Sequence, residues 1–157
     1  MERKVDLWPF VGFIFLSLLT GGLATVVSLD GIRAYQTLPR SPLTPPPAVF
    51  SVVWTVLYIL MGVSAALIYR ASPRGLKDEH LLYAGTLLLN FLWPVLFFAL
   101  TLRLAALVLL LVMIAAAIGV LVRYRPISRP AALSQLPYTL WLFFALYLNL
   151  TAYRLNG

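Results

Sequence analysis

The amino-acid sequence predicts an all-α integral membrane protein with five transmembrane helices in one bundle. Hydrophobic residues make up 62% of its 157 residues and charged residues only 11%, whereas soluble domains average about 45–50% and about 25%. So few charged residues cannot cover a soluble globule, and so hydrophobic a chain does not stay disordered. Five apolar runs have the length of about 20 residues that a membrane-spanning helix needs. Because apolar and polar residues do not alternate in them, these runs favour helices over the strands of a β-barrel.

Charge or proline bounds each of the five runs. The spans expected from these bounds are residues 8–29, 48–69, 81–102, 104–122 and 131–153. The length predicts a single domain over residues 1–157. The first run follows Arg3 and Lys4 and holds a cleavage-like Gly-Leu-Ala sequence at residues 22–24, as a signal peptide would. Its apolar stretch is longer than the core of about 7–15 residues in a signal peptide, so we expect a retained helix.

The connection between the first two spans, residues 30–47, is the longest. It holds five of the eleven prolines, which are Pro39, Pro42, Pro45, Pro46 and Pro47. Proline fixes its own φ and favours extended backbone in the residue before it, so this loop is stiff. A long, stiff loop is suited to closing over a site, and a solvated linker is the alternative.

The third and fourth spans meet at a tight turn around residues 102–104 and must be antiparallel neighbours. Pro94 falls inside the third span, where it removes a backbone hydrogen bond and is expected to kink the helix. Such a kink can widen a cavity, because neighbouring groups can satisfy the freed carbonyl. Pro137 lies early in the fifth span, where its effect is smaller.

The charged residues exclude several classes of function. Twelve Lys and Arg give a net charge of +7, but they are scattered over the ends of the apolar runs, which argues against nucleic-acid binding. With no cysteine and one histidine, neither a disulfide framework nor a metal site is expected. The five acids, Glu2, Asp6, Asp30, Asp78 and Glu79, lie outside the expected spans. Proton-coupled pumping, ion-driven transport and catalysis by paired carboxylates therefore lack their usual groups.

Polar and aromatic residues inside the spans indicate a binding site. An amide such as Asn90 must find a partner in hydrocarbon, so it faces another helix or a cavity. Helical spacing gives the second, third and fifth spans an aromatic stripe beside a polar group. The stripes consist of Trp54 and Tyr58; Asn90, Trp93 and Phe97; and Tyr138, Trp141, Ala145 and Asn149. Ordinary helix packing is the alternative, and Trp8, near a span end, fits an interface anchor.

Four segments carry motifs in a fixed order and spacing. They are YQTL (35–38) with LTPP (43–46), VWTVLY (53–58), NFLWP (90–94) with FF (97–98), and PYTLW (137–141) with FA (144–145) and LN (148–149). Together, from about residue 8 to residue 156, they resemble the TspO/MBR family. This family comprises the bacterial tryptophan-rich sensory proteins and the mitochondrial translocator protein, or peripheral-type benzodiazepine receptor.

The resemblance implies a five-helix bundle, often a homodimer, with a pocket closed by the first long loop. Family members bind porphyrins such as protoporphyrin IX or haem-type tetrapyrroles, benzodiazepine-type compounds and sterols, and they need no cofactor. Spacing and resemblance together imply ligand-binding residues at Tyr35, Pro46, Trp54, Tyr58, Asn90, Trp93, Phe97, Tyr138, Trp141 and Ala145.

Among these residues, Trp54 and Trp141 match the tryptophans that are linked with porphyrin photochemistry in the family. The loop departs from the family pattern, because Ala34 and Leu43 stand where tryptophan is frequent. Part of an aromatic lid is therefore missing. The sterol motif is also incomplete, since no spacer separates Tyr153 from the following arginine.

Three functions are compatible with these features. The first is a membrane protein that binds porphyrin or a similar flat apolar ligand, with a role in tetrapyrrole handling or stress sensing. The second is an enzyme that degrades porphyrin in light, in which the ligand's own photochemistry would supply the reaction and Trp54 and Trp141 would be the catalytic residues. The third is a transporter of porphyrin or sterol, which the lack of an evident inverted repeat disfavours.

The basic residues suit contact with lipid headgroups and predict the orientation. Eight of the twelve fall on one side of the membrane and four on the other. The eight are Arg3, Lys4, Arg70, Arg74, Lys77, Arg123, Arg125 and Arg129, and the four are Arg33, Arg40, Arg103 and Arg154. This excess places the amino terminus in the cytoplasm and the carboxyl terminus outside, in a bacterial cytoplasmic membrane.

A topology reporter tests this orientation. Fused after Gly157, it should be active on the outer side of the cytoplasmic membrane, because the less basic side is the translocated one. Activity of the same fusion in the cytoplasm would overturn the predicted topology.

Overall fold

The computed structural model describes residues 6–71 and 77–157, which form five long helices and no strand. The helices are α1 (Trp8–Tyr35), α2 (Pro47–Ala71), α3 (Lys77–Pro94), α4 (Arg103–Tyr124) and α5 (Arg129–Asn156), with a short π-helix, η1 (Val95–Ala99), continuing α3. Each is long and apolar enough to cross a membrane when α3 and η1 are taken together. The prediction of an all-α bundle with five transmembrane helices is confirmed.

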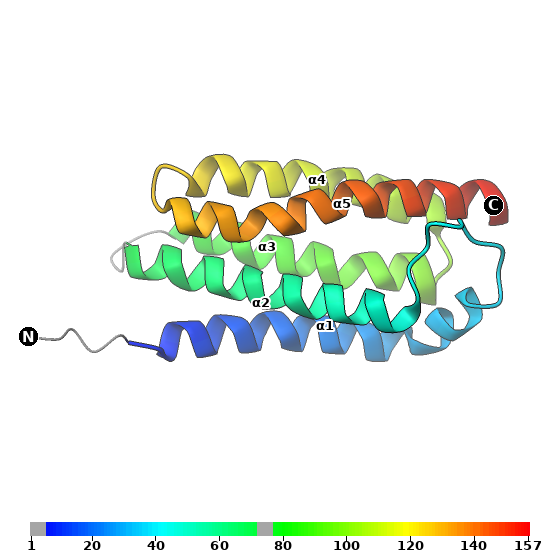
Figure 1. The fold of residues 1–157 in the computed structure, drawn as a ribbon, viewed down its shortest axis with the longest axis horizontal. Helices are drawn as coiled ribbons and strands as arrows, with labels where there is room; N and C mark the ends of the chain where they lie inside the picture. The colour runs from blue at the N-terminus through cyan, green and yellow to red at the C-terminus, as the bar shows by residue number, and fades with distance from the viewer. Residues whose placement is uncertain (1–5, 72–76) are drawn as a thin grey trace, which may run out of the picture.

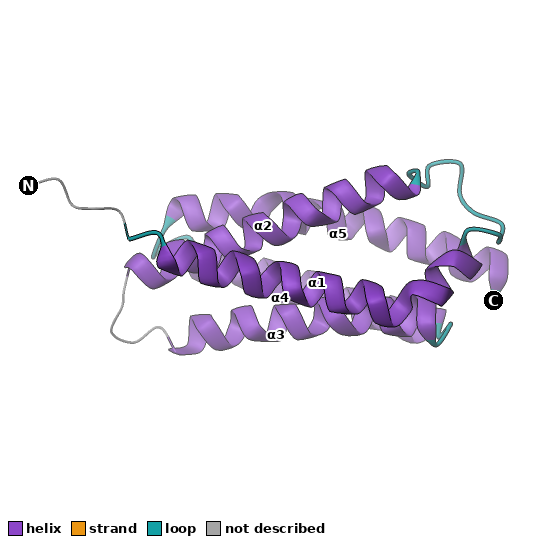
Figure 2. Ribbon diagram, turned by 90° about the horizontal axis from the view of Figure 1, so that it is seen from below, coloured by secondary structure: helices purple, strands orange, loops and turns teal. Residues whose placement is uncertain are grey.

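The helices run alternately up and down and lie side by side (Figure 1). Around the bundle their order is α1, α2, α5, α4, α3, and α3 packs again on α1. Seen from below, α1 lies between α2 and α3 (Figure 2). The 36–46 loop, the turn between α3 and α4 and the carboxyl terminus share one end of the bundle, which we call the loop end.

The charged residues that predict the orientation divide between the two ends of the helices. The loop end carries Arg33, Arg40, Arg103 and Arg154, and the opposite end carries Arg70, Lys77, Arg123, Arg125 and Arg129. The remaining predicted contributors, Arg3, Lys4 and Arg74, lie outside the described residues, as does Glu2.

The first helix extends beyond its expected span, which ends at residue 29, as far as Tyr35. Within this extension Asp30 and Arg33 form an exposed i, i+3 ion pair at 3.6 Å. The expected span stops at the first charged residue after the apolar run. An ion pair with i, i+3 spacing stabilises a helix, however, so the helix continues through these residues. The extra turns bring Tyr35 to the loop end, beside η1.

Pro94 changes the type of the third helix. The sequence predicts a kink at this proline, and the structure shows the α-helix giving way directly after it to the π-turn of η1. Proline has no N–H, so the regular ladder is interrupted there. The chain adopts the wider bonding pattern, in which the Leu100 N–H donates to the Val95 carbonyl at 2.9 Å. Thr101, with φ of 54°, then turns the chain into α4.

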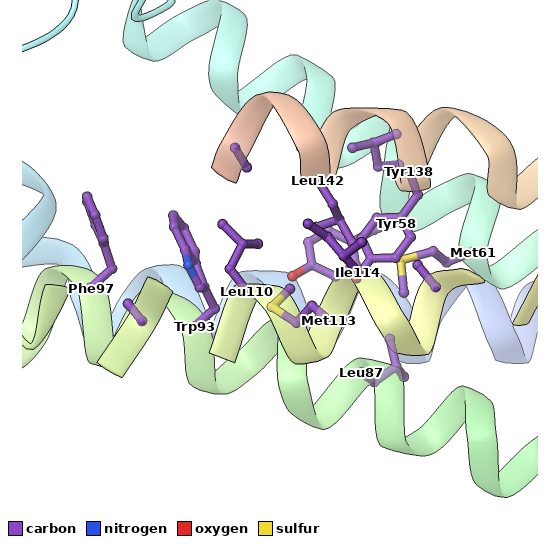
Figure 3. Packing of buried hydrophobic residues seen from close by; sticks show 14 of the residues in the cluster. Tyr58, Met61, Leu87, Trp93, Phe97, Leu110, Met113, Ile114, Tyr138 and Leu142 are labelled. Atoms are coloured by element: carbon purple, nitrogen blue, oxygen red, sulfur yellow. The ribbon is translucent and has the colours of Figure 1, made fainter. Parts of the chain in front are cut away.

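The hydrophobic core lies between α2, α3, α4 and α5. Figure 3 shows side chains from these four helices meeting, among them Met61, Met113, Tyr138 and Leu142, all nearly inaccessible. Along α1, by contrast, the buried residues are small ones: Ser17, Ala24 and Ser28. Many large side chains of α1, such as Trp8, Phe15 and Val26, are exposed where lipid would cover them, whereas Phe13, Ile32 and Tyr35 pack against the core.

Glycines allow α1 to approach its neighbours closely. A Cβ atom at Gly31 would collide with the backbone carbonyl of Phe98 in η1. A Cβ atom at Gly62 of α2 would lie 2.5 Å from the Cα of Ile14. Small residues at such contacts let the backbones of membrane helices come together.

Replacing Gly31 by alanine should therefore destabilise the protein. The added methyl meets backbone, which cannot rotate away, so we expect Gly31→Ala to lower the free energy of unfolding by about 1–3 kcal/mol. Thermal unfolding in detergent would measure the change. Gly119→Ala is the matched control, because a Cβ there meets nothing within 4 Å, and this variant should be as stable as the parent or more so. Equal melting temperatures for both variants would contradict the close contact.

Candidate functional site

A cavity of about 620 Å³ lies in the loop-end half of the bundle, between α1, α2, α3, η1 and α5. Its volume falls within the range of about 300–1,000 Å³ for small-molecule sites. Seven aromatic residues line it, and they are Tyr35, Phe50, Trp54, Tyr58, Trp93, Phe97 and Phe98. The few polar groups beside them suit a site for a largely apolar ligand.

One wall of the cavity consists of stacked aromatic rings. Trp93 and Phe97 are 5.0 Å apart between ring centroids and nearly parallel, at 14°, and Figure 3 shows them side by side on the α3–η1 segment. Tyr35 packs edge-on against Phe97 at 5.2 Å. On α2, the rings of Trp54 and Tyr58 are 5.8 Å apart. These flat surfaces offer stacking contacts to a planar ligand.

The side formed by α1 and α2 is open. Gly22 and Thr25 of α1 and Ser51 and Thr55 of α2 line the cavity and are exposed. Their short side chains leave room between the two helices.

Asn90 contributes an unpaired acceptor to the wall. Its Nδ2 donates to the Thr86 carbonyl and to the Tyr138 hydroxyl, both at 2.7 Å. Since a carbonyl only accepts, these bonds fix which end of the amide is nitrogen. The Oδ1 atom is then buried without a partner. Leaving such an acceptor unpaired costs about 1–3 kcal/mol, which a ligand N–H or O–H would offset.

A second amide holds the aromatic wall in place. The Trp93 Nε1–H donates to Asn149 Oδ1 at 3.1 Å, and Asn149 Nδ2 donates to the Arg103 carbonyl at 3.1 Å. These bonds connect α3, α5 and the first residue of α4. The position of the Trp93 ring is therefore fixed by two neighbouring helices.

The 36–46 loop lies against α5. The hydroxyls of Ser41 and Tyr147 share a hydrogen bond at 3.0 Å, and Asn156 Nδ2 donates to the Pro39 carbonyl at 3.0 Å. The loop also contributes Arg40 and Thr44 to the cavity lining. These contacts place the proline-rich segment over the loop end of the cavity, where a lid would lie.

The residues singled out from the sequence fall into two groups. Those that line the cavity are Tyr35, Trp54, Tyr58, Asn90, Trp93, Phe97 and Ala145. Pro46, Tyr138 and Trp141 lie outside this lining. Tyr138 stands directly behind it, because it accepts a hydrogen bond from Asn90 and its ring lies 6.5 Å from that of Trp54.

Phe50 stands between the two tryptophans that the sequence placed in one pocket. Its ring centroid lies 6.2 Å from Trp54 and 6.0 Å from Trp141. Trp141 also packs on Phe144 at 5.2 Å. The sequence contained a signal for Phe50, which precedes Trp54 by one helical turn and therefore shares its face.

Apart from Tyr35, the lining from α1 was not found from the sequence. It includes Leu18, Gly21, Gly22, Ala24, Thr25, Leu29 and Ile32. A cavity wall made of small and aliphatic residues resembles any other stretch of a transmembrane helix, so only the Gly21-Gly22 pair hints at it. Arg40 and Phe98 were also missed, although Arg40 is a charged residue in the loop that was expected to cover the site.

The described residues contain no group of three or more His, Cys, Asp or Glu that could hold a metal ion. The acidic residues nearest to one another, Asp78 and Glu79, bind Arg123 at 3.4 and 2.8 Å at the end opposite the cavity. This cluster connects α3 to α4.

Comparison with known proteins places the chain among membrane proteins of one family. The TspO/MBR family pattern matches residues 10–154. The translocator protein of Ovis aries is 35% identical over 152 residues, covering 94% of this chain and 90% of that protein. The tryptophan-rich protein TspO of Archaeoglobus fulgidus is 32% identical over 157 residues, covering 98% and 100%. Protein CrtK of Rhodobacter capsulatus is 33% identical over 128 residues, covering 78% of each chain.

Proposed function

The chain belongs to the TspO/MBR family, and on that premise we propose that it binds porphyrin or a similarly flat apolar ligand beneath the 36–46 loop. The observation that carries this proposal is the aromatic lining of a cavity of about 620 Å³ inside a membrane bundle. Binding would serve tetrapyrrole handling or stress sensing.

The shape of the lining supports a planar ligand. Trp93 and Phe97 present nearly parallel rings, and each aromatic contact adds about 0.5–1.5 kcal/mol beyond the burial of area. The opening between α1 and α2 supports a ligand that arrives from the bilayer. The Asn90 Oδ1 atom supports a ligand that also carries a hydrogen-bond donor.

Light-dependent degradation of porphyrin is the second candidate. It is favoured by the position of Trp54, whose ring lies 5.8 Å from Tyr58 and 6.5 Å from Tyr138. Trp54 and the two tyrosines in contact with it are oxidisable and could supply electrons to a photoexcited ligand held against Trp54. The ligand itself would provide the photochemistry, and the protein would provide its position.

The role of Asn90 can be tested by replacing it with leucine, which suits a membrane helix. We expect Asn90→Leu to weaken protoporphyrin IX binding about tenfold, the loss of one good hydrogen bond. Titration in darkness, followed by the porphyrin absorption band, would measure it. Thr139→Val is the control, since the Thr139 hydroxyl is buried but bonds within its own helix. A lowered melting temperature with unchanged affinity would assign Asn90 to helix packing alone.

The two candidate functions differ in what the tryptophans do under illumination. In darkness, Trp54→Phe should weaken protoporphyrin IX binding by less than about tenfold, because an aromatic wall remains. Trp141→Phe should weaken it less, because Phe50 stands between Trp141 and Trp54. In light, an enzyme should bleach bound porphyrin, and the bleaching rate should fall much further than affinity in Trp54→Phe, since phenylalanine lacks the oxidisable indole.

Trp8→Phe provides the control for both measurements, because Trp8 is 81% exposed near the end opposite the cavity. It should change neither affinity nor bleaching. Absence of porphyrin binding to the unmodified protein would contradict the proposed function. Binding without any light-dependent loss of absorbance would reject the enzyme.

A further inference from the structure

The loop end of the bundle carries an excess of positive charge. Four described arginines lie there, and among the described residues Asp30 is the acidic side chain at the same end. Asp30 is already bound by Arg33 at 3.6 Å. Arg40 therefore has no carboxylate partner among the described residues.

Among the described residues that line the cavity, Arg40 is the one with a charged side chain. It lies in the 36–46 loop, which follows Tyr35, the last residue of the aromatic wall on α1. Arg40 and Tyr35 both line the cavity, so Arg40 lies at this edge of the aromatic wall, and Arg103 begins α4 at the same end of the bundle. The Nε atom of Arg103 is itself buried without a hydrogen-bond partner. Arg40 thus places a cation where the apolar lining meets the loop.

We propose that the cavity takes an amphiphilic ligand with a carboxylate, which pairs with Arg40 while the aromatic part of the ligand lies against Trp93 and Phe97. This inference rests on the proposed function and adds the charge and orientation of the ligand. A guanidinium forms two parallel hydrogen bonds to a carboxylate, so it fixes direction as well as adding affinity. The surplus of positive charge at the loop end would also attract anionic ligands to the mouth.

A phosphate group of a membrane lipid is the other anion that Arg40 could meet. Binding measured in a nonionic detergent without phospholipid removes that competitor. The carboxylate can then be tested by comparing protoporphyrin IX with its dimethyl ester, which keeps the macrocycle and loses the charge.

The experiment titrates both porphyrins in darkness against the unmodified protein, Arg40→Gln and Arg154→Gln. We expect the unmodified protein to prefer the acid over the ester by about tenfold, the size of one charge-assisted hydrogen bond. Arg40→Gln should lose this preference and keep its affinity for the ester. Arg154→Gln removes the same charge from an exposed position at the same end, outside the lining, and should keep the preference.

The possible failures are distinguishable. Equal binding of acid and ester to the unmodified protein, or a preference that survives Arg40→Gln, would overturn this inference and leave the porphyrin site standing. An equal loss of preference in Arg40→Gln and Arg154→Gln would assign the effect to the general field and not to a carboxylate held by Arg40. If neither porphyrin binds, the proposed function fails and this inference fails with it.

Discussion

The way in which the backbone satisfies its hydrogen bonds after Pro94 determines how the loop end of the bundle is built. In hydrocarbon no water replaces a missing donor, so the chain widens into η1 and regains a regular bonding pattern there. The widened turn brings the Phe98 carbonyl against Gly31 of α1 and places Phe97 in the aromatic wall. A proline in one helix and a glycine in its neighbour thus shape the loop end of the bundle, where the cavity lies.

The bundle is held together differently on its two sides. Large apolar side chains of α2, α3, α4 and α5 form the core, and the amides of Asn90 and Asn149 each connect α3 to α5. The buried residues of the first helix are small ones, and Gly31 lets it lie close to the Phe98 carbonyl of η1. The aromatic wall of Trp93 and Phe97 stands on the α3–η1 segment, and residues of α1 and α2 contribute to the rest of the cavity lining.

The sequence predicted the five helices because an apolar run of about 20 residues matches the hydrocarbon thickness of a bilayer. It predicted much of the aromatic lining because helical spacing places Trp93 and Phe97 on one face. It did not predict the π-turn, since a proline reveals a missing donor but not how the chain compensates. Nor did it separate Trp54 from Trp141, because a shared face of a helix does not reveal which ring, here Phe50, lies between them.

The spacing of the polar groups along the cavity sets a minimum length for a ligand that contacts all of them. Asn90 and Phe97 are two turns apart along α3 and η1, a separation of about 10 Å. Phe97 contacts Tyr35 at the loop end, where Arg40 enters the lining. A molecule that reaches both the Asn90 acceptor and Arg40 must therefore extend over about 10 Å or more, with an apolar middle against the aromatic wall. A small polar metabolite is too short for this arrangement, whereas a macrocycle with charged substituents on one edge has the required length and distribution of polarity.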